Sequence, residues 1–291
     1  NLAASLVFVA ALGVLYGALG TLNLADVAGR LAALPREQAL LARVALALLA
    51  AVFAFKAALL PLGFWLPHAY AAAAPPVAAL FSVLTKVGIY AMIRTETLLF
   101  PGEHVNALLL VVAALTMVVG ILGALAQTDI KRILSFILVS HIGYMIFGVA
   151  LGSVAGLSGA IFYAVHHILV QTSLFLVVGL VERQAGSAQL RRLGSLLYTA
   201  PVIAVLYLIP ALNLGGIPPL SGFLGKVMLI QAGAEDGSWL AWVLIGGAVV
   251  TSLLTLYAMV LVWSKAFLRD RSDAPEGDVA MARPSTLADR Y

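Results

Sequence analysis

The sequence predicts an all-α polytopic membrane protein with about eight transmembrane helices, two of them broken. Two observations lead to this fold class. Of the 291 residues, 63% are hydrophobic and only 10% are charged, and the mean hydropathy is +1.06. Soluble domains are nearer half apolar and a quarter charged. The apolar residues also fall into stretches of about 20 or more, which is the length that spans a bilayer.

The spans can be placed in order along the chain. We expect them at about 2–22, 41–65, 75–99, 105–127, from after 128–132 to 151, then 156–181, 200–232 and 239–267. Residues 23–38 have the pattern of a short interfacial helix that begins at Asn23 or Asp26 and ends at Pro35. A polar tail follows at 268–291. Eight loop or span-end Lys and Arg residues lie on the side of this tail, against four on the other side, which favours a cytoplasmic tail.

Two of the spans contain helix-breaking residues. The breaks are expected at Pro61 in the second span and at Pro210, Gly215, Gly216, Pro218 and Pro219 in the seventh. Broken backbone in a bilayer frees polar groups that lipid cannot satisfy, so it lines protein or a wet cavity. Secondary transporters place ion sites at such breaks, and they often carry inverted repeats. Each break has a lysine beside it, Lys56 or Lys226, which is a weak sign of internal symmetry.

Only three lysines fall well inside apolar spans: Lys56, Lys86 and Lys226. A lysine at the bilayer centre costs a few kcal/mol, so it indicates a functional site. The alternative is a lysine near a helix end that extends to the membrane interface, and mid-span Lys86 suits this least. None of the 13 Asp and Glu residues lies in a span interior. We therefore expect lysines that are partly deprotonated, or a partner acid outside this sequence.

Three histidines lie within spans: His141, His166 and His167. Histidine titrates near neutral pH, so these residues are candidate proton-relay groups between the lysines. No Cys or acid lies at metal-ligand spacing from them, so we expect no metal site. Neighbouring residues lie about 100° apart on a helix, and only one of the adjacent pair is expected to face the interior.

Asp129, Lys131 and Arg132 form a charged group where the fifth span begins. We interpret them as structural, because an acid suits a helix N-terminus and cations anchor the cytoplasmic side. The chain has no cysteine, which excludes disulfides and iron–sulfur sites. It has no nucleotide-binding motif, and its net charge of +4 does not suggest nucleic acid, so no cofactor is expected. Without an initial Met or a signal-peptide pattern, we interpret it as an internal segment of a longer chain.

Three long motifs carry a family resemblance. They are KAALLPLGFWLPHAYAAAAPPVAALFSVLTKVGIY at Lys56–Tyr90, TDIKRILSFILVSHIGYM at Thr128–Met145 and GGIPPLSGFLGK at Gly215–Lys226. With them, residues 1–267 resemble the antiporter-like subunits shared by Mrp-type cation/proton antiporters and respiratory complex I. Within that family, the stretch at 16–31 and the lysine in VLTKVGIY favour the D-type branch of the Mrp antiporter subunits.

The resemblance implies inverted repeats of five helices each. Residues 1–99 would then be the end of the first repeat, with three spans and the interfacial helix, and 100–267 the second repeat, with five. It also implies that Lys56 and Lys226 are the broken-helix lysines, and that Lys86 and His166 or His167 connect them along a polar axis. The family's partner glutamate for Lys56 would precede Asn1. Family members often carry a lysine where this chain has Gln171, which cannot hold a proton.

These observations predict a proton-conducting subunit of a multi-subunit Na⁺/H⁺ antiporter in the cell membrane. Its expected partners are other membrane subunits and the lipid bilayer, with H⁺ and Na⁺ as the transported ions. Two alternatives stay open. One is a proton-pumping subunit of a complex I-like or membrane hydrogenase redox complex, driven by cofactors on neighbouring chains. The other is a scaffold whose lysines bind lipid headgroups or the carboxylates of a partner.

Overall fold

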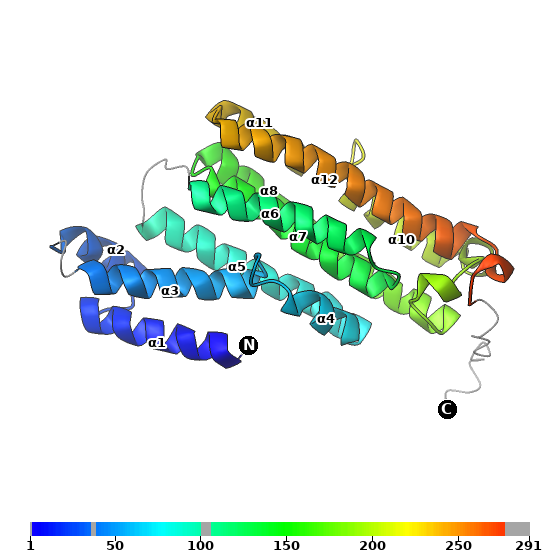
Figure 1. Cartoon of the computed structure of the whole chain (residues 1–291), viewed down its shortest axis with the longest axis horizontal. Coiled ribbons are helices and arrows are strands. Elements are labelled where there is room, and N and C mark those ends of the chain that lie inside the picture. Colours follow the sequence, from blue (N-terminus) through cyan, green and yellow to red (C-terminus); the bar gives the residue numbers. More distant parts are fainter. Residues whose placement is uncertain (1, 36–38, 100–105, 277–291) are drawn as a thin grey trace.

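The computed structural model describes residues 2–35, 39–99 and 106–276, in which every regular element is a helix (Figure 1). The helices are α1 Leu2–Leu19, α2 Leu24–Ala33, α3 Ala39–Ala57, α4 Trp65–Ala72, α5 Pro75–Leu99, α6 Ala107–Leu125, α7 Ile130–Ala150, α8 Val154–Ala185, α9 Leu196–Thr199, α10 Pro201–Gly215, α11 Ser221–Asp236 and α12 Trp239–Trp263. Single turns of 3₁₀-helix at Leu190–Arg192 and Arg271–Asp273, and of π-helix at Ser264–Leu268, complete the set.

Seven helices of this part of the chain are long and apolar enough to cross a membrane, namely α1, α3, α5, α6, α7, α8 and α12 with its π-turn. The remaining predicted span, 200–232, is the shorter apolar helix α10 followed by α11. The chain is therefore an all-helical, multi-pass membrane protein, as its sequence predicts.

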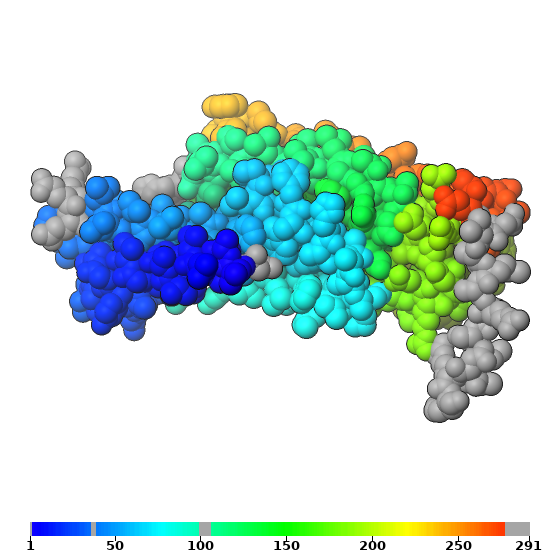
Figure 2. Space-filling view, turned by 60° about the horizontal axis from the view of Figure 1, so that its bottom comes forward, coloured from blue at the N-terminus to red at the C-terminus, as the bar shows by residue number. Residues whose placement is uncertain are grey.

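Helix α7 lies at the centre of the bundle. Of its most apolar stretch, 94% is buried inside the protein, more than for any other described span. Helices α4, α6, α8, α11 and α12 pack against it. Helices α1 to α3 form one end of the molecule, and residues 264–276 lie at the opposite end (Figures 1 and 2). Any ionisable side chain of α7 that points inward is thus remote from lipid.

The first break lies between α3 and α4. Helix α3 ends at Ala57, and helical structure resumes at Trp65, so the broken span extends to Ala72 instead of ending at Trp65. Leu60 N donates to Thr116 Oγ1 at 3.2 Å, and Trp65 Nε1 donates to Phe55 O at 3.1 Å. Side chains thus satisfy backbone groups that the break frees, as a membrane interior requires.

The second break is shorter than the sequence suggests. The break expected at Pro210 is not observed, because α10 continues through this residue to Gly215. A proline in a membrane helix removes one backbone hydrogen bond, and neighbouring helices can compensate for that loss. The helix instead ends at Gly216, whose φ of 83° places it in the left-handed region that glycine adopts without strain. Pro218 and Pro219 follow, and α11 begins at Ser221.

Helix α2 corresponds to the predicted interfacial helix. Asn23, not Asp26, is its cap, and the Asn23 side chain accepts a hydrogen bond from Ala25 N. Asp26 pairs with Arg30 at 3.1 Å, and this hydrogen bond lowers the pKa of the Asp26 carboxyl. The helix ends at Ala33, just before Pro35; residues 36–38 of the prediction lie outside the described part.

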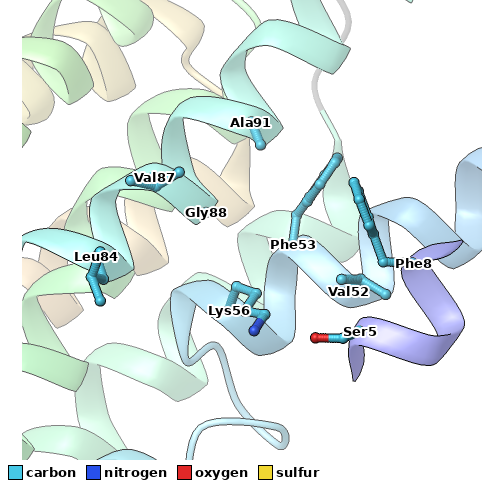
Figure 3. A pocket seen from close by; sticks show the side chains of 9 residues that line it. All are labelled: Ser5, Phe8, Val52, Phe53, Lys56, Leu84, Val87, Gly88 and Ala91. Carbon is cyan, nitrogen blue, oxygen red and sulfur yellow. The ribbon is translucent and has the colours of Figure 1, made fainter. Parts of the chain in front are cut away.

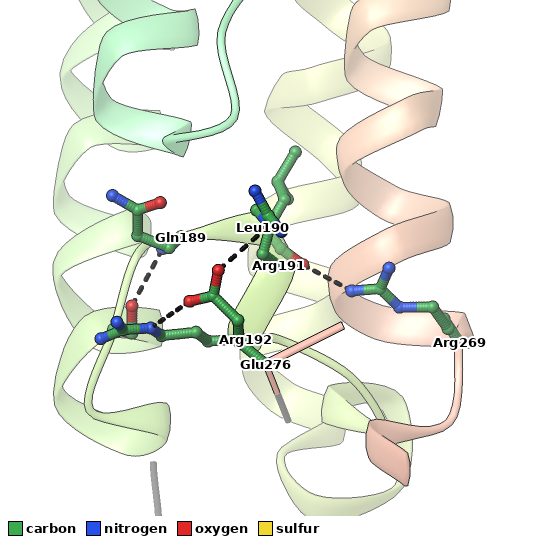
Figure 4. A network of polar contacts seen from close by, with 7 residues as sticks. Gln189, Leu190, Arg191, Arg192, Arg269 and Glu276 are labelled. Carbon is green, nitrogen blue, oxygen red and sulfur yellow. Dashed lines mark hydrogen bonds and ion pairs between the residues drawn. The ribbon is translucent and has the colours of Figure 1, made fainter. Parts of the chain in front are cut away.

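Residues after α12 are joined to the loop that follows α8 (Figure 4). Glu276 forms ion pairs with Arg191 at 3.1 Å and Arg192 at 3.0 Å. Arg269 donates to the backbone oxygens of Leu190 and Leu193. The first part of the predicted tail is therefore packed onto the bundle, and 277–291 lie outside the described residues.

Helices α6 and α7 approach each other closely at Gly143 of α7, where there is no side chain to separate the two backbones. A Cβ added to Gly143 would lie 2.5 Å from Met117 Cγ and 2.7 Å from Ala113 O. Gly246 in α12 has open space around it, with no atom within 4 Å of an added Cβ.

We expect Gly143→Ala to destabilise the purified protein by about 1–3 kcal/mol, because the extra methyl group overpacks the α6–α7 contact. Gly246→Ala is the matched control and should leave thermal unfolding in detergent nearly unchanged. Equal unfolding temperatures for both variants would contradict the close packing described here.

Candidate functional site: a buried lysine–histidine cluster

The structure gathers several predicted site residues into one buried group, here called the lysine–histidine cluster. Its members are Lys86 of α5, His141 and Tyr144 of α7, Tyr163, His166 and His167 of α8, and Lys226 of α11. No member is more than 5% exposed. These ionisable groups thus share one interior where dielectric screening is low.

His141 and Tyr163 join the aromatic part of the cluster. The Tyr163 hydroxyl and His141 Nδ1 lie 2.9 Å apart, within hydrogen-bond distance. The rings of His141 and His167 have centroids 5.1 Å apart, and those of Tyr163 and His166 lie 5.4 Å apart. Three imidazoles and a phenol from two helices therefore form one group of neighbouring rings.

Both members of the histidine pair face the interior, so the expectation that only one would do so is wrong. His166 is 4% exposed and His167 is fully buried. Helices α5, α7, α10 and α11 all pack against α8, so more than one face of this helix is interior. His166 Nδ1 lies 2.9 Å from Ser221 Oγ at the start of α11. Neither ring nitrogen of His167 has a hydrogen-bond partner among the described atoms.

Lys226 is held by oxygen atoms that the second break leaves available. Its Nζ donates to Leu214 O at 3.1 Å, Gly215 O at 3.2 Å and Ser252 Oγ at 2.8 Å. We call these three oxygens the Lys226 oxygen cage. They surround an ammonium group without any carboxylate.

The sequence explains why the two carbonyls are available. In an unbroken helix they would accept hydrogen bonds from the amides four residues on, at positions 218 and 219. Both positions are proline, which has no amide hydrogen. The C-terminal end of α10 also carries the negative end of the helix dipole. Backbone thus supplies the counter-charge that the sequence seemed to lack, and the Tyr144 ring lies 5.5 Å from the ammonium.

Lys86 forms the other end of the cluster. Its Nζ donates to Ser82 O at 2.8 Å, one turn earlier in α5. Ser82 Oγ lies 3.1 Å from Thr172 Oγ1, which joins α5 to α8. His167 lies close enough to both Lys86 and Lys226 to interact electrostatically with each of them. The two buried lysines and the histidines thus share one interior, in which they interact through space.

Lys56 borders a cavity at the α1–α3 end of the molecule (Figure 1). It sits in the last turn of α3, is partly exposed, and borders a cavity of about 350 Å³ between α1, α3 and α5 (Figure 3). The other lining residues are Ser5, Phe8, Val52, Phe53, Leu84, Val87, Gly88 and Ala91. None of these lining residues belongs to the lysine–histidine cluster.

Gln171 occupies the position one turn after His167. It is fully buried, and its Nε2 donates to Leu134 O of α7 at 2.9 Å. Its Oε1 has no hydrogen-bond partner among the described atoms. The residue thus cross-links α7 and α8 one turn from the histidines and presents an acceptor to the interior.

Asp129, Lys131 and Arg132, at the start of α7, make local contacts that do not involve the lysine–histidine cluster. Asp129 caps the helix by accepting a hydrogen bond from Arg132 N at 3.1 Å. Lys131 pairs with Glu182 of α8 at 3.2 Å, and the Arg132 side chain is exposed. The helix begins at Ile130, so Lys131 and Arg132 lie in its first turn rather than before it. These contacts agree with a structural role.

Sequence reasoning did not identify Tyr144, Tyr163 and Ser252. Each tyrosine lies three residues from a histidine, Tyr144 after His141 and Tyr163 before His166. Residues three apart share a helix face, so this spacing was available as a signal. Among the described residues, no group of three or more His, Cys, Asp or Glu could hold a metal ion.

Comparison with known proteins identifies the family. A family described as NADH:quinone oxidoreductase/Mrp antiporter, transmembrane, matches residues 1–255. The chain belongs to this family. The D-type subunit of the Na⁺/H⁺ antiporter from Alkalihalophilus pseudofirmus is 41% identical over 280 residues, and that from Bacillus subtilis is 36% identical over 279. Each alignment covers 95% of this chain and 56% of the relative, so the chain spans about half the length of these curated relatives.

Solved structures of this family have the same fold as this chain. The Mrp complex from a Dietzia species matches 99% of this chain and 53% of its own, with a TM-score of 0.85 and 37% identity. A chain of an archaeal membrane-bound sulfane sulfur reductase matches 96% of this chain and 57% of its own, with a TM-score of 0.81 and 28% identity. Respiratory complex I of Thermus thermophilus matches 95% of this chain and 60% of its own, with a TM-score of 0.79 and 29% identity.

Proposed function

We propose that this chain is part of the D-type subunit of an Mrp-type Na⁺/H⁺ antiporter and conducts protons through the lysine–histidine cluster. The observation that carries this proposal is the burial of Lys86, the three histidines and Lys226 together in one interior of the bundle. The names of the two curated relatives support the antiporter branch. Ionisable side chains inside a membrane are retained where they carry ions or protons.

The arrangement of these buried groups suggests a route for the proton. A proton on Lys86 Nζ passes to the ring nitrogens of His167, then by way of His141, Tyr163 and His166 to Lys226 Nζ. Each transfer changes the charge on one group and so changes the proton affinity of its neighbours, because Coulomb interactions are strong at low dielectric. The oxygen cage stabilises the protonated form of Lys226 and thereby gives the proton a resting position.

Lys56 would serve a second half-site. In this proposal, residues 1–99 are the end of one inverted repeat and 100–267 form the other, with Lys56 and Lys226 in corresponding broken helices. The cavity beside Lys56 gives its ammonium an opening toward α1. The partner glutamate would lie before residue 1, with the whole protein in the cell membrane, the tail on the cytoplasmic side, and other antiporter subunits alongside.

A Lys56→Ala variant of the full-length subunit tests this role. We expect pH-gradient-driven transport in membrane vesicles to fall at least about tenfold, because the first half-site loses its proton carrier. Assembly of the complex, measured by copurification of the other subunits, should be unchanged. Full transport in both Lys56→Ala and Lys226→Ala would contradict the proposal.

The two alternatives predict different outcomes. If the chain belongs to a redox-driven pump, as its likeness to respiratory complexes would allow, the purified complex should contain quinone-reducing or iron–sulfur cofactors. A scaffold predicts that the lysine variants lose assembly and that any assembled complex still transports.

A further inference from the structure

We infer that the Lys226 oxygen cage is also a binding site for an alkali cation, Na⁺ in the first place, which enters when the lysine ammonium leaves. This inference rests on the proposed function, and it adds a location for the second transported ion. No carboxylate of the described residues takes part.

The chemistry of the cage fits a hard cation. Its three donors are all oxygen: Leu214 O and Gly215 O from the C-terminal end of α10, and Ser252 Oγ from α12. They converge on a single positively charged atom, Lys226 Nζ, at 2.8 to 3.2 Å. Hard cations prefer oxygen ligands of this kind, and transporters bind Na⁺ at the carbonyls and C-terminal ends of broken helices.

The two carbonyls receive no helical hydrogen bond from positions 218 and 219, since Pro218 and Pro219 cannot donate, although Gly215 O does accept from Ser252 Oγ. If the ammonium leaves, two desolvated carbonyls at the negative end of a helix dipole remain without a cation, which is costly in a buried site. The Tyr144 ring, 5.5 Å from the ammonium, offers a further attraction for a cation.

Gly216 keeps the cage accessible. A Cβ at this position would lie 3.2 Å from Lys226 Nζ and 3.1 Å from its Cδ, so a larger residue would restrict movement of the lysine. Ser252 Oγ also donates to Gly215 O at 3.1 Å, and its hydroxyl can rotate to turn a lone pair toward an ion.

The two occupants exclude each other, because each carries one positive charge and both use the same oxygens. The exchange is balanced: protonated Lys226 plus one Na⁺ gives neutral Lys226, one bound Na⁺ and one released H⁺. The N–H bond breaks, its electron pair stays on Nζ, and the proton leaves toward the histidines. The titratable groups that face Lys226 are His141 and Tyr144 on α7 and His166 and His167 on α8, whereas α10 and α12 contribute the cage oxygens.

The experiment uses the full-length subunit in its assembled complex. In Lys226→Ala the cage has no ammonium, so NaCl, compared with choline chloride at equal ionic strength, should raise the unfolding temperature of this subunit by about 3 °C at about 100 times the dissociation constant. The double variant Lys226→Ala/Ser252→Ala should lose most of this shift. Size-exclusion chromatography shows that both variants remain assembled.

A second measurement uses the unmodified complex. Adding NaCl to a weakly buffered sample at alkaline pH should release protons, and the Lys226→Ala variant should release fewer by one per subunit. The inference is overturned if Lys226→Ala shows no Na⁺-specific shift and proton release does not depend on Lys226. In that case, loss of vesicle transport in Lys226→Ala would still support the proton path, so the two proposals can fail separately.

Discussion

Replacing Lys226 with alanine is expected to reduce Na⁺-dependent proton movement by about a hundredfold or more, to background. Lys226 donates three hydrogen bonds to the oxygen cage, and the relay ends at its ammonium. Alanine removes the proton-carrying group and leaves nothing at that position that can be charged. Dissipation of a pH gradient on addition of NaCl to everted vesicles, followed with a pH-sensitive dye, measures the effect.

Lys265→Ala provides the matched control for this prediction. Lys265 lies in the π-turn after α12, outside the lysine–histidine cluster. Its removal should leave the transport rate within about twofold of the original, as for most surface changes. Comparable losses in both variants, or unchanged transport in Lys226→Ala at normal expression, would show that Lys226 has no special role.

A His167→Leu variant should lose transport to a similar degree. His167 is fully buried, its ring nitrogens have no described partner, and it lies within electrostatic reach of both buried lysines. Leucine fills a similar volume but can neither accept nor donate a proton, so the series between Lys86 and Lys226 is interrupted. The initial rate of proton release from everted vesicles on addition of NaCl should fall by about a hundredfold.

The control for this variant is His68→Leu, because His68 is exposed on α4. Thermal unfolding separates a proton-transfer defect from misfolding: removing a buried histidine without hydrogen bonds should not lower the unfolding temperature of the complex. A His167→Leu variant that transports normally would place the proton path elsewhere.

Five ionisable residues that the sequence placed inside apolar spans are buried in the structure. Lys86, Lys226 and the three histidines stand out because such residues are costly in apolar spans. The overall fold was equally accessible, because span length and composition are strong signals in membrane proteins. The structure then added what no pattern of single residues shows, namely that α5, α7, α8 and α11 bring these side chains into one group.

Three features could not be predicted in this way, each for a physical reason. Tyr144 and Tyr163 are ordinary residues in a membrane helix, so only their spacing from the histidines marks them. Both residues of the histidine pair are buried because helices surround α8, which is a property of tertiary packing. The counter-charge of Lys226 consists of backbone carbonyls, and a search for acidic side chains cannot find it.

Pro218 and Pro219 make the two carbonyls that bind Lys226 predictable from the sequence. They lie four residues after Leu214 and Gly215, so their missing amides identify the two free carbonyls from the sequence alone. Pro210, in contrast, led to a wrong prediction, because α10 continues through this single proline. The consequence of a proline thus depends on which acceptors lose their donors and on what lies nearby.

The proposed proton path between Lys86 and Lys226 is tested most directly at Lys86, the lysine that lies away from the oxygen cage. The measurement is the initial rate of Na⁺-dependent proton movement in everted vesicles that contain Lys86→Ala. Lys86 makes no described contact with the cage, and its described hydrogen bond is to its own helix. A continuous path predicts a rate as low as that of Lys226→Ala, with normal assembly. A rate equal to that of the unmodified complex would contradict it.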